Sequence, residues 1–310
     1  MLSRTANNLY WLTRYMERMD YVARLLEVGQ RMAGLSGSAE EWRSALVAAG
    51  CEPGYFEKHD EVATDRVVDF LVRDLDNPSS VRSCITTARQ NARAVRTAIT
   101  TDMWEAINGT WQESRELFAR SLGQESLNRA TDWVKTRGVL FRGAYASTML
   151  RNDAYCFARL GSYIERADNT ARILDVKYHI LLPRDESVGG GMDYYHWTAI
   201  LRAVSALRAY HWFYKDRVSP WNVAELLILK PEMPRSLHAC YDEITENLEK
   251  LNATYGSRPG ECHRLAGELH AGLRYGRIDN IFQTGLHEFL TQYIDRTFDL
   301  GDEISAQYLF

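Results

Sequence analysis

The sequence predicts an all-α protein, and three observations support this class. The 310-residue chain has only seven prolines, and none of them falls between Pro78 and Pro183. Apolar residues recur at helical spacing along almost the whole chain. Alternating apolar and polar residues joined by turn dipeptides, which are typical of β-hairpins, are nearly absent.

The helical spacing places the expected helices in chain order. They are residues 4–34, 40–50, 60–74, 79–107, 110–121, 124–143, 150–182, 193–216, 220–229, 235–254, 260–274 and 279–308. Ser219-Pro220 is typical of an N-cap followed by proline at the first helical position. Asn77-Pro78-Ser79-Ser80 indicates a turn into the helix that follows. Three consecutive glycines within residues 183–193 predict a flexible loop.

A twelve-residue pattern occurs twice. It is Tyr-x-Glu-Arg-x-Asp-x-x-Ala-Arg-x-Leu, and it begins at Tyr15 and again at Tyr163. Residues 11–28 and 159–176 align with nine identities in eighteen positions, and a weaker match between residues 67–84 and 223–240 follows in the same order. Repeated units usually stack on one another. We therefore expect a tandem repeat of two units of roughly 150 residues, at about 1–147 and 148–310, that form one domain as a pseudo-symmetric helical bundle.

Composition limits the classes of partner and the location. The formal net charge of -4 gives no bulk attraction to nucleic acid or to an anionic membrane. No apolar run reaches about 18 residues, and the N-terminus lacks the apolar stretch of a secretory signal. The five cysteines are odd in number and form no C-x-x-C pair, which favours reduced thiols. A cytoplasmic protein is the expectation.

Both copies of the pattern place unlike charges on one face of a helix. In each copy an aspartate precedes an arginine by four residues, an order that stabilises helices. The residues concerned are Glu17, Asp20 and Arg24 in the first copy and Glu165, Asp168 and Arg172 in the second. The stripes are either solvated, self-paired faces or faces of a shared polar interior, where an unpaired charge is expensive.

A further basic stripe lies between the copies. Residues 79–101 contain no Asp or Glu, yet Arg82, Arg89, Arg93 and Arg96 share one helical face. Their partners are carboxylates of the repeated helices, a bound anion, or water, since the guanidinium fork suits carboxylate and phosphate oxygens.

Several catalytic signatures are absent. The chain has no G-x-x-x-x-G-K-[ST], no dinucleotide fingerprint, no G-x-S-x-G and no E-x-x-H. Cys262-His263 and Glu268-Leu269-His270 are weak as metal ligands, and a pair of ordinary histidines is the commoner explanation. No metal or cofactor is expected.

Four segments together resemble the bacterial Alpha-E family. They are MLSRTANNLYWLTRYMERMDYVARLL, ARQNARAVR with MWEAIN behind it, TMLRNDAYCFARLGSYIERADNTARILDV, and PRSLHAC. The resemblance covers essentially the whole chain and implies an all-helical domain named for its Glu-Arg motif. It carries over Trp11, Arg14, Tyr15, Glu17, Arg18, Arg24, Arg89, Asn91, Arg93, Arg96, Trp104, Glu105, Asn108, Thr148, Met149, Arg151, Asp153, Gly161, Glu165, Arg166, Arg172, Pro234, Arg235 and Ser236.

The resemblance also implies a functional context. Such proteins are encoded beside, or fused to, circularly permuted ATP-grasp proteins and transglutaminase-like peptidases, which implies a role in making or modifying a small peptide or amide bond. We expect an accessory protein that binds an anionic or peptide-like ligand, or the ATP-grasp partner. The expected binding residues are Arg14, Glu17, Arg18, Arg24, Arg89, Arg93, Arg96, Glu165, Arg166, Arg172 and Arg235.

Roles for these residues follow from their chemistry. The arginines would hold a carboxylate or phosphate, while Glu17 and Glu165 would orient them or accept an amine. Two alternatives stay open. One is an enzyme in which Glu17 or Glu165 is a general base, and the other is a scaffold whose charges form an internal ion-pair lattice.

Overall fold

The computed structural model describes residues 1–36, 39–180, 191–256 and 258–310. Within these residues there are fifteen α-helices and no strand, which confirms the predicted all-α class. The first eight are α1 (Ser3–Ser36), α2 (Ala39–Ala48), α3 (Glu52–Phe56), α4 (Thr64–Val72), α5 (Val81–Ala94), α6 (Thr101–Leu117), α7 (Gln124–Thr148) and α8 (Asp153–Ile180). The others are α9 (Gly191–Ala203), α10 (Leu207–Tyr214), α11 (Pro220–Ile228), α12 (Leu237–Tyr255), α13 (Glu261–Arg274), α14 (Ile278–Thr284) and α15 (Leu286–Tyr308).

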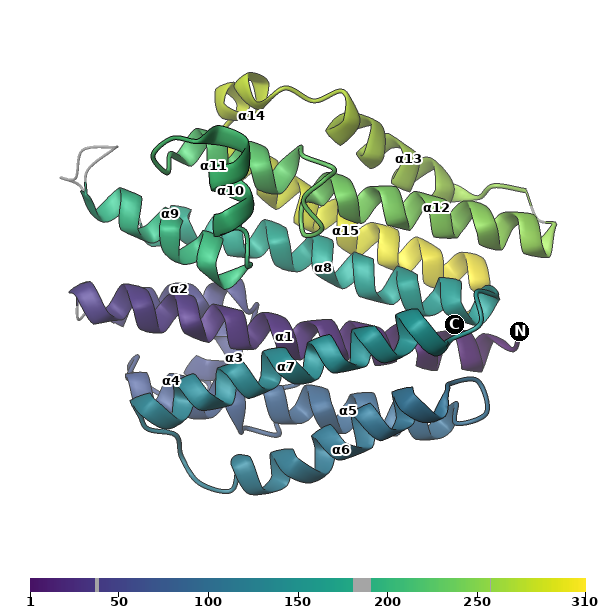
Figure 1. Ribbon diagram of the computed structural model, residues 1–310, viewed down its shortest axis with the longest axis horizontal. Helices are drawn as coiled ribbons and strands as arrows, with labels where there is room; N and C mark the ends of the chain where they lie inside the picture. The colour runs from purple at the N-terminus through teal and green to yellow at the C-terminus, as the bar shows by residue number, and fades with distance from the viewer. Residues whose placement is uncertain (37–38, 181–190, 257) are drawn as a thin grey trace.

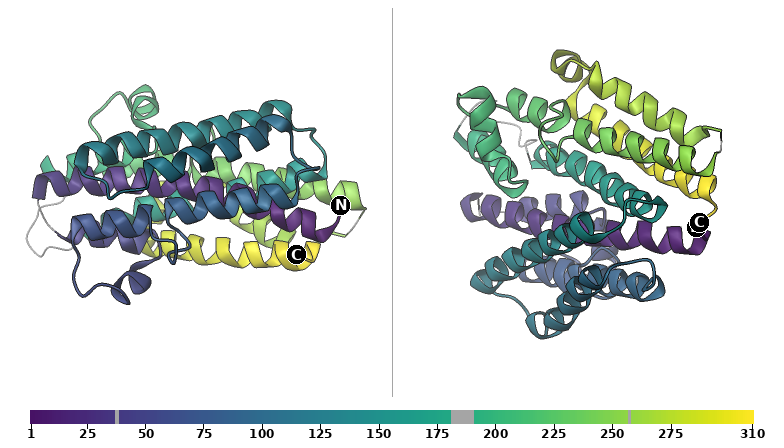
Figure 2. Two further views of the ribbon diagram at one scale, coloured as in Figure 1. Left: turned by 90° about the horizontal axis from the view of Figure 1, so that it is seen from below. Right: turned by 45° about the vertical axis from the view of Figure 1, so that its right-hand side comes forward.

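The long helices α1 and α8 lie side by side at the centre of the molecule (Figure 1). α5 and α7 pack on α1, with α6 outside them, while α12 and α15 pack on α8, with α13 outside them. The chain termini lie at the same end of the molecule (Figures 1 and 2), where the Tyr10 and Phe310 rings are 5.5 Å apart between centroids. Because the two charged stripes lie on α1 and α8, they meet where these two helices pack together.

One glycine lets α1 and α8 approach closely. A Cβ atom at Gly161 of α8 would overlap the Tyr10 carbonyl oxygen and the Thr13 hydroxyl of α1. Both Tyr10 and Thr13 are buried. The sequence therefore permits this contact only because position 161 has no side chain.

Four expected helices have different boundaries in the structure. The helix expected over 79–107 ends at Ala94, and α6 (Thr101–Leu117) takes the place of the helix expected over 110–121. α6 begins after Thr100, whose hydroxyl caps it by accepting from the Met103 amide at 3.2 Å. The helix expected over 193–216 is interrupted at Ser205, and the one over 279–308 at Gly285, because both residues have positive φ angles, 59° and 107°.

Other expectations at helix ends have mixed outcomes. The start at Ser219-Pro220 is confirmed, since the Ser219 hydroxyl accepts from the Asn222 amide at 3.3 Å. The short helix α3 was not expected from the sequence. Most of the predicted loop at 183–193 lies outside the described residues. In the described part of the chain, no helix combines the length and apolar character needed to cross a bilayer.

Candidate functional site

Glu165 of α8 is buried against α1 and binds two arginines of that helix. Its Oε1 accepts from Arg18 Nε at 2.6 Å, and its Oε2 accepts from Arg14 Nε at 2.7 Å and from Arg18 Nη2 at 3.0 Å. The Arg14 guanidinium also lies 4.7 Å from the centroid of the Trp11 ring. Arg18 thus holds the carboxylate with a bidentate fork, the strongest geometry for this pair.

Glu17 of α1 makes the reciprocal contact with α8. Its Oε1 accepts from Arg166 Nη2 at 2.5 Å and from Arg142 Nη1 of α7 at 3.2 Å. The two Glu-Arg dipeptides, 17–18 and 165–166, are therefore cross-paired, the glutamate of each with the arginine of the other. The stripes face a shared polar interior rather than solvent.

Asp20 extends the Glu17 side into a closed network. Its Oδ2 accepts from Arg24 Nε at 2.9 Å and from Arg235 Nη2 at 2.8 Å, and Arg142 Nη1 lies 3.6 Å from the same oxygen. Arg24 also donates to the Ala203 carbonyl. Burial lowers the pKa of Arg235 to about 10, although Asp20 opposes the change.

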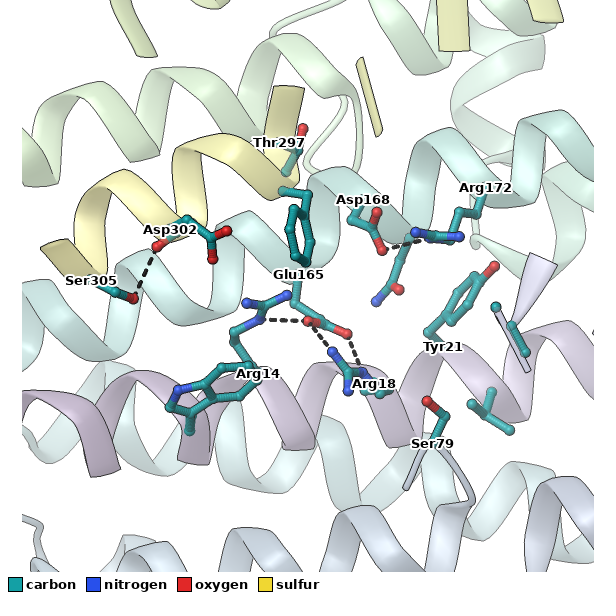
Figure 3. Close-up of a pocket in the computed structure, with 17 residues that line it drawn as sticks. Arg14, Arg18, Tyr21, Ser79, Glu165, Asp168, Arg172, Thr297, Asp302 and Ser305 are labelled. Atoms are coloured by element: carbon teal, nitrogen blue, oxygen red, sulfur yellow. Dashed lines mark hydrogen bonds and ion pairs between the residues drawn. The ribbon is translucent and has the colours of Figure 1, made fainter. Parts of the chain in front are cut away.

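On the Glu165 side the network opens into a cleft of about 280 Å³. Residues of α1, α8 and α15 face one another across it (Figure 3). The cleft is lined by Trp11, Arg14, Arg18, Tyr21, Val22, Ala49, Gly50, Ser79, Glu165, Asp168, Asn169, Arg172, Thr297, Phe298, Gly301, Asp302 and Ser305. It thus combines guanidinium groups, carboxylates and aromatic rings.

The charged groups of the cleft retain unused binding capacity. Asp168 Oδ2 accepts from Arg172 Nε at 2.8 Å, and this is its one ion pair among the described residues. The terminal nitrogens of Arg172 have no hydrogen-bond acceptor within the described part of the chain. Asp302 is exposed at the rim. The cleft can therefore both donate to an anion and accept from a cation.

The basic stripe of α5 does not join this network. Arg89 donates from Nε to Asn108 Oδ1 at 2.9 Å, and its guanidinium lies 4.0 Å from the Trp111 ring centroid. Arg93 and Arg96 are exposed, and among described residues no carboxylate forms an ion pair with any of the three. The structure thus places Arg89 and Arg96 against α6, where aromatic rings and an amide take the place of carboxylates.

The arginines fix the protonation state of both glutamates. Burial raises a carboxyl pKa, but Arg166 and Arg142 outweigh it and lower the pKa of Glu17 to about 2. Arg18 and Arg14 likewise outweigh burial at Glu165, whose pKa is about 2. A carboxylate this acidic is a poor general base at neutral pH.

The cysteines do not offer a nucleophile in its place. All five are free thiols. Burial raises the pKa of Cys84 and of Cys240 to about 12, although Arg18 opposes the change at Cys84 and Arg166 opposes it at Cys240. Both thiols are therefore protonated at neutral pH and unreactive.

The lowered pKa values predict acid sensitivity. Folded-state values below the unfolded ones mean that the stabilisation is complete above about pH 5 and is lost as the pH falls towards 2. A depression from 4.5 to about 2 contributes roughly 3 kcal/mol per glutamate. Urea denaturation at a series of pH values should show the free energy of unfolding falling steeply between pH 5 and 2. A constant value over this range would contradict the expectation.

Several residues of the site were not identified from the sequence. Arg142, Ser79, Gly301 and Asp302 come from segments without the repeated pattern. The alignment of residues 67–84 with 223–240 could have drawn attention to Ser79, since it places this serine opposite Arg235. No sequence signal marks Arg142.

The fold and site define an all-helical protein whose two central helices are joined by reciprocal glutamate–arginine pairs. The profile of the Alpha-E family, described as a predicted alpha-helical domain with a conserved ER motif, matches residues 1–309, and the chain belongs to this family. Comparison with curated proteins and with solved structures gave no match.

Proposed function

We propose that the chain is an accessory, substrate-binding protein of an ATP-grasp-associated peptide or amide ligase system. The cleft beside Glu165 would bind a small peptide-like ligand that carries both an amino group and a carboxylate. The observation that carries this proposal is the unused capacity of Asp168 and Arg172 within a cleft of about 280 Å³. That volume lies at the small end of ligand sites, which favours an amino acid or a short peptide.

We infer that the chain arose by tandem duplication, with units at about 1–147 and 148–310 that form one domain. The packing supports this inference, because the partners of α1 and α8 correspond. α1 packs on α2, α5 and α7, and α8 packs on α9, α12 and α15, in the same chain order. The cross-paired Glu-Arg dipeptides are likewise exchanged by the alignment.

The correspondence between the two units explains why the network around Asp20 is closed, while the equivalent region around Asp168 opens into the cleft. Arg235 directly precedes the N-cap Ser236 of α12, and Ser79 directly precedes the N-cap Ser80 of α5. Arg235 reaches Asp20, whereas Ser79 lines the cleft beside Asp168 and is too short to fill it.

A second arginine of the closed side is also replaced by a small residue. The buried positions of α7 and α15 have matching spacing when residue 131 is aligned with 290, and then Arg142 corresponds to Gly301, which lines the cleft. The aligned buried pairs are Thr131 with Leu290, Val134 with Tyr293, Gly138 with Thr297, Phe141 with Leu300 and Tyr145 with Ile304.

These replacements predict which group enters the cleft. Asp20 has three arginine neighbours, at 2.8, 2.9 and 3.6 Å, but the corresponding Asp168 pairs with Arg172 alone among the described residues. A ligand ammonium or guanidinium beside Asp168 would supply the missing positive charge. The terminal nitrogens of Arg172 would hold the ligand carboxylate, and the rings of Trp11 and Phe298 would flank its apolar part.

The proposed partners rest on the family resemblance. A ligand with an amine and a carboxylate suits a system that forms or remodels amide bonds. The activating ATP would belong to the circularly permuted ATP-grasp protein, with a transglutaminase-like protein as a further partner. The low pKa values of Glu17 and Glu165 weigh against the alternative of an enzyme with a glutamate base. The fully paired network around Glu17 and Asp20 fits the alternative of a structural scaffold. The cleft beside Glu165 does not, because a scaffold needs no binding cavity.

The test combines the chain with a circularly permuted ATP-grasp protein, the partner proposed here. ATP consumption over a panel of amino acids and dipeptides should require both proteins, while the chain alone turns over nothing. Asp168→Asn and Arg172→Met should each reduce the ligand-dependent rate at least ~10-fold, because each removes a charge-assisted contact.

Matched surface variants separate this effect from a general change in charge. Glu125→Gln and Arg129→Met alter an exposed pair on α7 at 3.7 Å and should leave the rate unchanged. Wild-type rates for both cleft variants would overturn the assignment of the cleft. Amide turnover by the isolated chain would instead establish an enzyme.

A further inference from the structure

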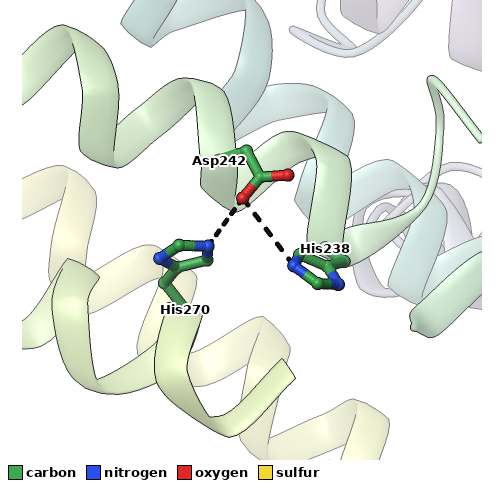
Figure 4. Close-up of side chains that lie close together, drawn as sticks. All are labelled: His238, Asp242 and His270. Atoms are coloured by element: carbon green, nitrogen blue, oxygen red, sulfur yellow. Dashed lines mark hydrogen bonds and ion pairs between the residues drawn. The ribbon is translucent and has the colours of Figure 1, made fainter. Parts of the chain in front are cut away.

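We propose that His238, Asp242 and His270 form a binding site for one divalent transition-metal ion of the Zn²⁺ type. The site lies between α12 and α13, outside the cleft, and does not depend on the proposed function (Figure 4). Its donor set is two imidazoles and one carboxylate.

The helices bring the three side chains together. His238 and Asp242 are one turn apart on α12, and His270 projects from α13, which packs on α12. One ligand atom from each residue lies within 4.8 Å of the others. His270 Nε2 is 2.6 Å from Asp242 Oδ1, and His238 Nε2 is 3.7 Å from the same oxygen.

His238 is already oriented as a ligand. Its Nδ1 lies 2.9 Å from the Leu229 carbonyl oxygen, which can only accept a hydrogen bond, so Nδ1 carries the proton. This leaves Nε2, on the side of Asp242 and His270, as the nitrogen that can bind an ion. This arrangement, a backbone carbonyl behind the ring, is the usual support of a metal-bound histidine.

The charge of Asp242 also favours a cation. Among described residues no lysine or arginine forms an ion pair with it; its partners are the two imidazoles. The side chain is 44% exposed, so an ion has access from solvent.

The donor set and spacing select the class of metal. Imidazole with carboxylate suits Zn²⁺ and its first-row neighbours, whereas Mg²⁺ and Ca²⁺ prefer oxygen ligands alone. Tetrahedral Zn²⁺ with bonds of about 2.0–2.2 Å needs its ligand atoms roughly 3.3 Å apart. The distances from Asp242 Oδ1 to the two imidazoles, 2.6 and 3.7 Å, bracket this spacing, and all three ligand atoms lie within 4.8 Å of one another, so rotation of the side chains about their χ angles would bring them around the ion. His270 would release its Nε2 proton on binding, and water would complete the shell.

Zn²⁺ titration of untagged, metal-free protein, followed by calorimetry, tests the site. The wild type should bind one Zn²⁺ per chain, and its melting temperature should rise with Zn²⁺ concentration. His270→Ala and Asp242→Asn should weaken binding at least ~10-fold. His211→Ala, which removes an exposed histidine elsewhere, should bind as wild type.

Co²⁺ substitution identifies the ligand atoms. Nitrogen and oxygen ligation gives visible absorption without the intense charge-transfer band of a thiolate, so a cysteine site would be recognised. Circular dichroism establishes that each variant is folded. Unsaturable binding, a thiolate band, or wild-type affinity in both His270→Ala and Asp242→Asn would overturn the proposal.

Discussion

Replacing Glu17 with glutamine is expected to lower the free energy of unfolding by about 3–5 kcal/mol. The glutamate is 2% exposed and is the acceptor for Arg166 and Arg142. Glutamine keeps the shape but removes the charge, so two largely buried guanidiniums lose a counter-ion, and such an uncompensated charge costs more than the pair itself contributes. Urea denaturation of the purified variant measures the change.

Two comparisons show that the effect arises from the unpaired charge. Glu125→Gln, on an exposed pair, should change the free energy of unfolding by less than about 0.5 kcal/mol. Adding Arg166→Met to Glu17→Gln should recover part of the loss, because replacing both members of a buried pair by uncharged groups is often nearly neutral. A loss below about 1 kcal/mol for Glu17→Gln would mean that water screens the network.

The same substitution at Glu165 should be milder. Its partners Arg14 and Arg18 line the cleft, whereas Arg166 and Arg142 do not, so water in the cleft can solvate the partners of Glu165 once the carboxylate charge is gone. Glu17 and Glu165 occupy equivalent positions in the repeated pattern. A smaller loss of stability in Glu165→Gln than in Glu17→Gln would therefore reflect the cleft, which opens beside Glu165 alone of the two.

The fold class followed from the sequence because helical periodicity is a local property. The helix break at Gly285 was missed, although a glycine marks it, because its φ of 107° is a conformation that favours glycine. Ser205 carries no such signal, since serine at a φ of 59° is held there by its surroundings rather than by its own preference. The break before Thr100 was obscured by the continuous apolar spacing around Val95 and Ile99, which are both buried outside a helix.

The site was only partly predictable, because a helical wheel shows which residues share one face of a helix but not which other helix packs against that face. Periodicity placed Glu17 and Glu165 on polar stripes, and burial of those stripes was one of two open interpretations. The cross-pairing with Arg18 and Arg166 depends on where α1 and α8 meet, which tertiary packing decides. For the same reason the sequence left the partners of Arg89, Arg93 and Arg96 open between carboxylates of the repeated helices, a bound anion and water.

Gly161→Ala is expected to lower the free energy of unfolding by about 3 kcal/mol. In a helix, alanine is intrinsically better than glycine by about 1 kcal/mol, so local propensity alone predicts stabilisation. Packing reverses the sign of the change in the free energy of unfolding, because the new methyl group overlaps the Tyr10 carbonyl and the Thr13 hydroxyl. The carbonyl belongs to the backbone of α1 and cannot rotate away, so the helices must separate.

Separation of α1 and α8 would also lengthen every glutamate–arginine contact between them, which is why one methyl group should have so large an effect. Gly143→Ala in α7 is the matched control, since nothing lies within 4 Å of its Cβ position and the change should be neutral or stabilising by up to about 1 kcal/mol. Denaturation of both variants under the same conditions measures the contrast. Equal stability of Gly161→Ala and Gly143→Ala would show that the central helices have room to spare, and the cross-paired network would then not depend on their close approach.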